Sequence, residues 1–321
     1  MEPFGGSLAV LLNRPDEHKW WNRVETVGDY SGLVVNFHRA VAADPDRVAY
    51  YASWPVTETD LTARHLKLVR ENDRLTLQLM ADPEHFDLKL AGWWLWGLSS
   101  WVGGEWCSGL GPWKPGDPNG PGVYRKIPMV HGSHGGKGVH KKIVDPNVEP
   151  GTVVDVARNQ IQTSLRALSN RLRRVRVTCG DAERLLNGAV ATTGKNVCGV
   201  FLDPPYDLTL RRANLYGPTD VSPSSSASDA KQVHERVRAW AILRGDNPTI
   251  RIAYCSYSTP FEDAIFLSAG WVSHSWTAAG GYGLQSNNQA LENRGKEIVW
   301  FSPHCHPVKT VDSDNKGMKL F

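Results

Sequence analysis

Short runs of apolar and β-branched residues alternate with amphipathic stretches along most of this chain. The runs are four to six residues long and end at Gly, Asp or Pro, which is typical of buried strands. The stretches between them repeat apolar positions every three or four residues, which predicts helices with one covered face. Strands that alternate with helices predict an α/β fold with a parallel sheet. The expected strands are residues 24–27, 176–179, 197–202 and 250–255, with a β-rich tail at 271–276 and 297–301, and the expected helices are 31–43, 47–78, 156–172 and 231–244.

The run at residues 197–202 ends in Asp203-Pro204-Pro205-Tyr206. Two prolines cannot continue a central strand, so the chain has to leave the sheet at this point. In open α/β sheets, ligands bind at the carboxyl ends of the strands. A carboxylate that accepts hydrogen bonds, two prolines that fix the backbone and a flat tyrosine ring suit a planar base with an exocyclic amine. The alternative is a turn that only ends a strand.

Two further acidic residues follow predicted strands, and a glycine-rich turn precedes the first of them. Asp29 and Asp181 each come directly after a glycine at a strand end. A carboxylate in this position can take both hydroxyls of a ribose, although Asp29 could instead cap the helix that follows it. The turn at Gly5-Gly6 leads into an apolar helical run that stops at Pro15. Such a turn lets a ligand approach backbone N–H groups, although a plain turn has the same pattern.

Residues 79–150 differ from the rest of the chain in composition, and they predict an insert on the core. Tryptophans lie among many glycines, a Pro/Gly tract follows, and neither helical nor strand periodicity persists. Interleaved rings and cations suit phosphate contact and base stacking, although Trp93–Trp106 could instead pack a small subdomain. Histidines in this stretch have no cysteine pair beside them, which argues against a zinc site. The basic residues expected to contact nucleic-acid phosphates are Arg125, Lys126, Lys137, Lys141 and Lys142.

Bulk composition narrows the class of protein. The chain has 321 residues, of which 41% are hydrophobic and 21% charged, values typical of globular proteins. Its net charge is only +3, so a nucleic-acid surface has to be local. One basic run, residues 171–176, could contact phosphates or only end a solvated helix. Five scattered cysteines favour reduced thiols, and no apolar run has the length of a membrane helix, so we expect a cytoplasmic protein without membrane contact.

Four motifs in order resemble those of a DNA adenine N6-methyltransferase of the Dam-like type, close to phage and restriction-modification members. They are Glu-Pro-Phe-x-Gly-Ser at residues 2–7, the acidic strand end at Asp29, Gly180-Asp181, and Asp-Pro-Pro-Tyr at residues 203–206. The resemblance covers about residues 1–45 and 150–305. It implies a Rossmann-like sheet of the S-adenosylmethionine-dependent type, with an antiparallel edge strand and an inserted target-recognition region. The implied domains are a discontinuous catalytic domain of residues 1–78 and 151–308, a target-recognition insert of residues 79–150 and a polar tail of residues 309–321.

The resemblance also implies a role for each motif. The cofactor would be S-adenosylmethionine, with its ribose held by Asp29 and its adenine by Asp181. The target adenine, flipped out of double-stranded DNA, would stack on Tyr206. Asp203 and the Pro204 carbonyl would accept hydrogen bonds from its amine and aim the nitrogen lone pair at the methyl group. The residues implied at the methionine end of the cofactor are Glu2, Pro3, Phe4 and Gly6, and those of the catalytic turn are Asp203, Pro204, Pro205 and Tyr206.

One departure from the family leaves alternatives open. Members usually carry a Gly-Gly-Lys segment and a complete first strand before the Glu-Pro-Phe motif, which begins here at residue 2. The true start could lie upstream, a partner chain could supply the segment, or catalysis could be weakened. Gly135-Gly136-Lys137 has the sequence of this segment but lies in the insert. A partner-dependent DNA-binding subunit is therefore a second hypothesis, and RNA adenine or cytosine N4 are alternative acceptors, although cytosine-N4 enzymes more often have Ser at position 203.

Overall fold

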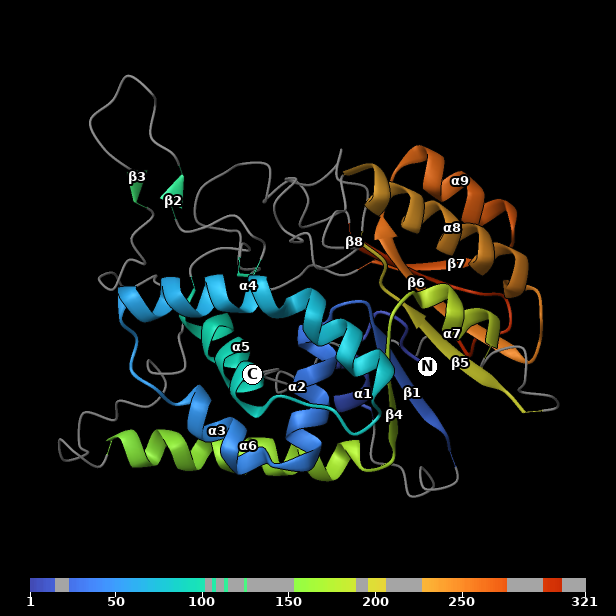
Figure 1. Cartoon of the computed structure of the whole chain (residues 1–321). Helices are drawn as coiled ribbons and strands as arrows, with labels where there is room; N and C mark the ends of the chain where they lie inside the picture. Colours follow the sequence, from blue (N-terminus) through green and yellow to red (C-terminus); the bar gives the residue numbers. More distant parts are fainter. Residues whose placement is uncertain are drawn as a thin grey trace, which may run out of the picture.

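The protein has the mixed α/β class that the sequence predicts (Figure 1). A computed structural model describes residues 1–14, 23–101, 106–107, 113–114, 124–125, 153–188, 196–205, 227–275 and 297–307. Within these ranges, the strands lie between two groups of helices (Figure 1). One group lies beside the strands near the N-terminus, and the other packs on the strands nearer the C-terminus. No helix in the described ranges has the length and apolar character needed to cross a membrane.

The strands form two hydrogen-bonded groups. In the first, β1 and β4 are parallel. In the second, β5 and β6 are parallel, β8 is antiparallel to β6, and β7 is antiparallel to β8. The antiparallel strand β8 therefore lies between β6 and the edge strand β7. The family resemblance implied instead that the antiparallel strand is the edge strand. The strands are β1 (Glu25–Asp29), β4 (Val175–Cys179), β5 (Cys198–Leu202), β6 (Ile250–Tyr257), β7 (Val272–Ser275) and β8 (Glu297–Phe301).

The first two residues of the chain join the two groups of strands. Glu2 forms a parallel bridge with Val27 of β1. On the other side, the Met1 amine donates to the Gly199 carbonyl of β5 at 2.7 Å, and the Phe201 N–H donates to the Met1 carbonyl at 2.9 Å. The bonds of residues 1–2 therefore link the two sheets, and the described strands lie in the order β4, β1, residues 1–2, β5, β6, β8 and β7. The sequence pattern showed a turn here and gave no sign of this central place.

Three helices pack on the half of the sheet that contains β5, β6 and β8. Val237 and Ala241 of α8 are fully buried against this half of the sheet, and Val233 and Trp240 pack beside them, as the apolar spacing predicts. In α9, Phe266 stacks on Trp300 with ring centroids 5.0 Å apart. Burial of each large apolar side chain contributes about 1.5–3 kcal/mol, so this cluster anchors both helices. The helices on this side are α7 (Ala182–Gly188), α8 (Ala227–Gly245) and α9 (Pro260–Ser268).

The other helices pack mainly on one another beside β1 and β4 (Figure 1). Leu165 and Leu172 of α6 are buried, and Ile161 and Leu168 complete the predicted apolar stripe. Helix α5 lies in the angle between α2 and α3 and carries the fully buried Trp96. These helices are α2 (Gly32–Ala43), α3 (Pro45–Ala52), α4 (Glu58–Ala81), α5 (Leu88–Ser100) and α6 (Val153–Leu172), and a short α1 (Ala9–Leu12) follows the N-terminal turn.

Helix starts follow local side-chain chemistry. The side chain of each capping residue accepts a hydrogen bond from a backbone N–H three residues later, which satisfies a donor that the first turn leaves free. In α3 and α9, a proline at the first helical position adds a pre-set backbone angle. The capping residues are Asp44 for α3, Thr57 for α4, Asp87 for α5 and Thr259 for α9.

The predicted insert of residues 79–150 begins inside this helical group. Helix α5 belongs to the predicted insert, yet it packs on α2 and α3 of the preceding segment. Further along, β2 (Trp113–Lys114) pairs antiparallel with β3 (Tyr124–Arg125). The target-recognition role of this region and its outer boundaries stay predictions, as does the polar tail of residues 309–321, which lies outside the described ranges.

Candidate functional site

Three acidic residues lie at the carboxyl ends of parallel strands. Asp29 is the last residue of β1, and its carbonyl accepts a hydrogen bond at 2.9 Å from the N–H of Gly180, which follows β4. Asp181 comes next in the chain, and Asp203 follows β5 on the far side of residues 1–2. The parallel pairing therefore brings the three predicted carboxylates to one edge of the sheet, where α/β folds bind ligands.

The N-terminal turn closes around the end of β1. The Gly5 N–H donates to the Gly28 carbonyl at 2.7 Å, and the Gly6 N–H donates to Asp29 Oδ2 at 2.9 Å. Gly6 has φ +44° and Leu8 has φ 60°, so the chain passes through the left-handed region on its way into α1. A Cβ built on Gly6 would meet no atom within 4 Å. Open space therefore lies beside a backbone turn that is fixed to Asp29.

The Asp29 carboxylate is held by backbone donors from two segments. Its Oδ2 accepts from Gly6 and its Oδ1 accepts from the Ser31 N–H at 2.8 Å. Burial raises the pKa of Asp29, and the backbone N–H groups act against that rise. The Tyr30 N–H is a third backbone donor to this carboxylate, which leaves one of its roughly four lone pairs to accept a hydrogen bond from a hydroxyl. The N-cap residue of α2 is Ser31. The alternative in which Asp29 caps this helix is therefore wrong.

The other residues predicted near the methionine end of the cofactor belong to the same turn. Glu2 and Pro3 are buried, and Phe4 packs against the apolar cluster beneath α8. Burial raises the pKa of Glu2, and the nearby N-terminal amine of Met1 acts against this rise. Backbone bonds of Glu2 to Thr26 (2.9 Å) and Gly28 (2.8 Å) fix the residue to β1. The structure thus brings Glu2, Pro3, Phe4, Gly6 and Asp29 together.

Asp181 lies on the surface at the start of α7. Its Oδ1 accepts from the Glu183 N–H at 2.8 Å, which orders the first turn of the helix. Arg236 reaches this turn from α8, with its Nη2 3.8 Å from Asp181 Oδ2 and its Nε 3.0 Å from Glu183 Oε1. No sequence motif pointed to Arg236 as part of the site. Nothing in the sequence around Arg236 indicates this contact, because it joins two helices that lie about fifty residues apart in the chain.

The Asp-Pro-Pro-Tyr motif leaves the sheet where the sequence predicts. Asp203 is exposed, whereas Pro204 and Pro205 are buried. Leu202, the last residue of β5, pairs with Tyr254 of β6. Burial raises the pKa of Tyr254, and the negative charge of Asp203 adds to the rise. Tyr206, the predicted stacking residue, lies outside the described ranges.

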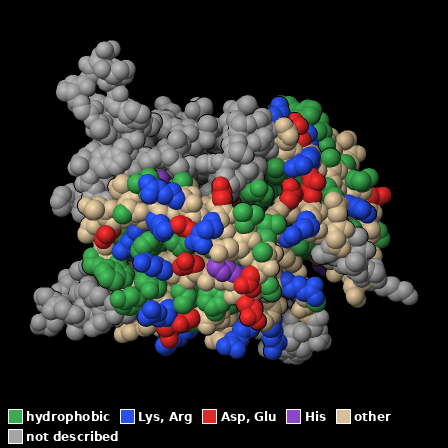
Figure 2. Space-filling model, viewed as in Figure 1, with side chains coloured by type: hydrophobic (Ala, Val, Ile, Leu, Met, Phe, Trp, Pro, Cys, Tyr) green, Lys and Arg blue, Asp and Glu red, His purple; other side chains and the backbone are tan. Residues whose placement is uncertain are grey.

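The predicted phosphate-contact residues remain predictions. Arg125 belongs to β3, but only its backbone is described, and the four lysines lie outside the described ranges. On the face drawn in Figure 2, Lys and Arg side chains lie among Asp and Glu side chains rather than in one basic area. On α4, for example, Lys67 Nζ is 2.7 Å from Glu71 Oε1. The lysines concerned are Lys126, Lys137, Lys141 and Lys142.

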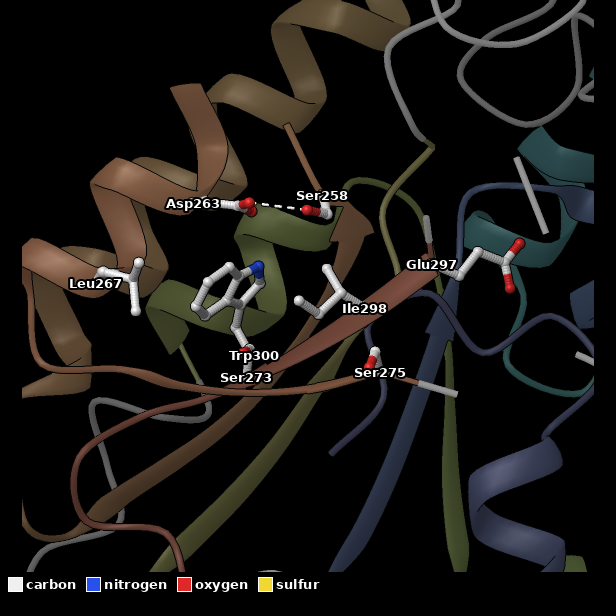
Figure 3. Close-up of a pocket in the computed structure, with 8 residues that line it drawn as sticks. All are labelled: Ser258, Asp263, Leu267, Ser273, Ser275, Glu297, Ile298 and Trp300. Carbon is white, nitrogen blue, oxygen red and sulfur yellow. Dashed lines mark hydrogen bonds between the residues drawn. The ribbon is translucent and has the colours of Figure 1, made fainter. Parts of the chain in front are cut away.

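A hollow and possible metal-ligand groups were the other candidate sites among the described residues. A hollow of about 360 Å³ lies between α9 and the outer strands (Figure 3), and no residue of the carboxyl-edge site lines it. Within the described residues, no group of three or more His, Cys, Asp or Glu side chains is arranged to hold a metal ion. The carboxyl edge with its fixed turn is therefore the better match to the predicted chemistry.

No protein-family model matches this chain, and no curated protein sequence matches it. The functional inference consequently depends on the motifs and on their arrangement at the carboxyl edge of the sheet.

Proposed function

We propose that this chain is a DNA methyltransferase that transfers a methyl group from S-adenosylmethionine to the N6 amine of adenine. The observation that carries the proposal is the hydrogen bond between the Gly6 N–H and Asp29 Oδ2, 2.9 Å long. It joins two motifs that are far apart in the sequence at the edge of the sheet where nucleotide-like ligands bind. The parallel strands on both sides of residues 1–2, together with the antiparallel β8, are compatible with a Rossmann-like methyltransferase sheet.

The residues at the carboxyl edge fit this cofactor. S-adenosylmethionine, when bound, supplies an electrophilic methyl group. Asp29 would accept a hydrogen bond from a ribose hydroxyl with the lone pair that its backbone donors leave available. The open space beside Gly6 would take the methionine end, and Glu2 and Pro3 belong to the same turn. Asp181 would accept a hydrogen bond from the adenine amine, and the Arg236 guanidinium would orient its carboxylate.

Asp203 and the backbone carbonyl of Pro204 would prepare the acceptor amine. Both accept hydrogen bonds from its N–H groups, which withdraws the nitrogen lone pair from the ring and aims it at the methyl carbon. As the new N–C bond forms, the S–C bond breaks, and the amine proton leaves afterwards. No base with a shifted pKa is needed, so catalysis depends on positioning and electrostatics. The exposure of Asp203 is consistent with an acceptor that arrives from outside the protein.

Double-stranded DNA is the proposed substrate, and the target adenine would be flipped out of the helix. Tyr206 would stack on the flipped base, and Arg125 with the lysines of the insert would contact phosphates. Pro205 is buried and would fix the turn that leads from Asp203 and Pro204 to Tyr206.

The test is transfer of a tritiated methyl group from S-adenosylmethionine to unmethylated genomic DNA. The wild-type chain is compared with Asp203→Ala and with Asp246→Ala, a change at a fully exposed aspartate that directly follows the end of α8. We expect label in adenine with the wild-type chain and with the Asp246 variant, and none with the Asp203 variant.

Calorimetry with the cofactor separates the remaining outcomes. Cofactor binding without methyl transfer would favour the alternative of a partner-dependent DNA-binding subunit. Label in cytosine or in added RNA would change the acceptor. Failure of the chain to bind S-adenosylmethionine would refute the proposal.

A further inference from the structure

The hollow beside α9 is separate from the carboxyl-edge site and has its own chemistry. It is bounded by α9 on one side and by β7 and β8 on the other (Figure 3). Its polar lining consists of three serines, two carboxylates and one indole: Ser258, Ser273, Ser275, Asp263, Glu297 and Trp300. The sequence analysis assigned a role to none of these residues.

At this hollow, two polar atoms of opposite hydrogen-bonding type have no partner among the residues that the structure describes. Trp300 is 1% exposed, and its Nε1–H finds no acceptor within the described part of the chain. Asp263 Oδ2 accepts from the Ser258 hydroxyl at 2.7 Å, but no described group donates to its Oδ1. In Figure 3 the indole nitrogen points from β8 toward Ser258 and Asp263. Unpaired buried polar atoms are uncommon in folded proteins, so an unpaired donor and acceptor at one cavity call for an explanation.

A hydroxyl group is suited to both atoms, because it accepts a hydrogen bond from an N–H and donates one to a carboxylate. The serine hydroxyls at the hollow can exchange hydrogen bonds with further hydroxyls, and Leu267 and Ile298 offer apolar contact to a carbon skeleton. We propose that this hollow is a binding site for a hydroxyl-rich small molecule, a monosaccharide or cyclic polyol, anchored by Trp300 Nε1–H and Asp263.

Size and charge support this class of ligand over two simpler occupants. A volume of about 360 Å³ lies at the lower end of small-molecule sites, at about 300–1,000 Å³, and far exceeds the roughly 30 Å³ of one water. A diamine would pair with the carboxylates of Asp263 and Glu297, but an ammonium has no acceptor to offer the Trp300 N–H. A polyol serves both anchors.

The experiment is ligand-observed saturation-transfer NMR on the full chain with D-glucose, D-ribose and myo-inositol, and with putrescine as the amine comparison. The variants are Trp300→Phe, which keeps the ring that stacks on Phe266, and Asp263→Asn, which keeps the size of the side chain. Ser275→Ala, at an exposed position on β7, changes the hollow with little risk to folding. The matched control is Trp240→Phe, because Trp240 Nε1 is also buried without a partner but does not line the hollow.

We expect at least one polyol to bind the wild-type chain, and loss of either anchor to raise its dissociation constant by about fivefold or more, as for one hydrogen bond. Ser275→Ala would weaken binding less, and Trp240→Phe would leave it unchanged. The proposal is overturned if no polyol binds, if putrescine alone binds, or if every variant binds as the wild type does. A crystal structure with only ordered water between Trp300 Nε1 and Asp263 Oδ1 after a glucose soak would overturn it as well. None of these readouts depends on methyl transfer.

Discussion

His38 makes the stability of this protein depend on pH in a direction that the structure fixes. The residue lies in α2 with 3% of its surface exposed, and burial lowers its pKa from 6.5 to about 4. In the unfolded chain, the same imidazole takes up a proton near its ordinary pKa. As the pH falls through this range, the unfolded state binds the proton first and gains stability relative to the folded state. Stability from this group is therefore complete above the unfolded pKa and decreases as the pH falls from 6.5 toward 4.

The size of the effect follows from the two pKa values of His38. A gap from 6.5 to about 4 corresponds to about 3 kcal/mol once the pH is below both values. At about pH 5, where the unfolded imidazole is charged and the folded one is still mostly neutral, about 2 kcal/mol of this is lost. Since the total stability of a domain is on the order of 5–15 kcal/mol, the loss is large enough to measure.

Urea denaturation at a series of pH values tests the assignment. We compare the wild-type chain with His38→Gln, which removes the titrating ring, and with His274→Gln, at an exposed position on β7. Between about pH 7.5 and pH 5, the wild type and the His274 variant should lose about 2 kcal/mol more than the His38 variant. Equal losses in all three proteins would show that His38 titrates normally in the folded state and would refute the reasoning.

Three other substitutions test the sheet edge that carries the candidate site. Arg171→Met leaves the buried Glu25 carboxylate with one guanidinium instead of two, so the unfolding free energy from urea denaturation should fall by about 3 kcal/mol; an unchanged value would contradict a structural ion pair. Gly28→Ala places a Cβ 2.4 Å from Leu185 Cδ1, and we expect a loss of about 1–3 kcal/mol by the same method, whereas no loss would mean that this packing is loose. Asp29→Asn replaces one carboxylate oxygen with an amide NH2 group, which cannot accept the hydrogen bond that a backbone N–H donates there. Calorimetry should show S-adenosylmethionine binding weakened by about tenfold or more, and equal affinity would remove Asp29 from the proposed cofactor site.

Local signals predicted the strands and their ends. A run of β-branched and apolar residues that stops at Gly-Asp or Asp-Pro contains both the strand and its boundary, because the same few residues set the backbone and the exit from the sheet. The strand expected at 176–179 is Val175–Cys179, and the one expected at 197–202 is Cys198–Leu202. The acidic residues after these strands lie at one edge of the sheet, because parallel strands place their carboxyl ends together.

Contacts between distant segments could not be predicted in this way. The basic run at 171–176 had two interpretations, phosphate contact or a solvated helix end, and neither describes Arg171. Its guanidinium makes two hydrogen bonds, of 2.6 and 2.9 Å, to the carboxylate of Glu25, which lies 146 residues earlier. Burial raises the pKa of Glu25, but the hydrogen bonds and positive charges of Arg171 and Arg14 together outweigh it, and the net pKa is lowered. A pairing of this kind depends on the fold that brings β1 and the end of α6 together, and no periodicity records it.

The tryptophans of α5 show why composition alone cannot separate a nucleic-acid surface from a core. Rings beside basic residues suit base stacking, but a ring can stack on a base only if one of its faces is free. Trp96 is 1% exposed, its Nε1–H donates to the Trp54 carbonyl at 2.7 Å, and the Arg64 guanidinium lies 4.1 Å from its ring centroid. Trp101 is stacked on His65 at 4.7 Å. The chain itself therefore encloses Trp96 with its cation and covers one face of Trp101, so the tryptophan content reflects packing at Trp96 rather than a free stacking surface.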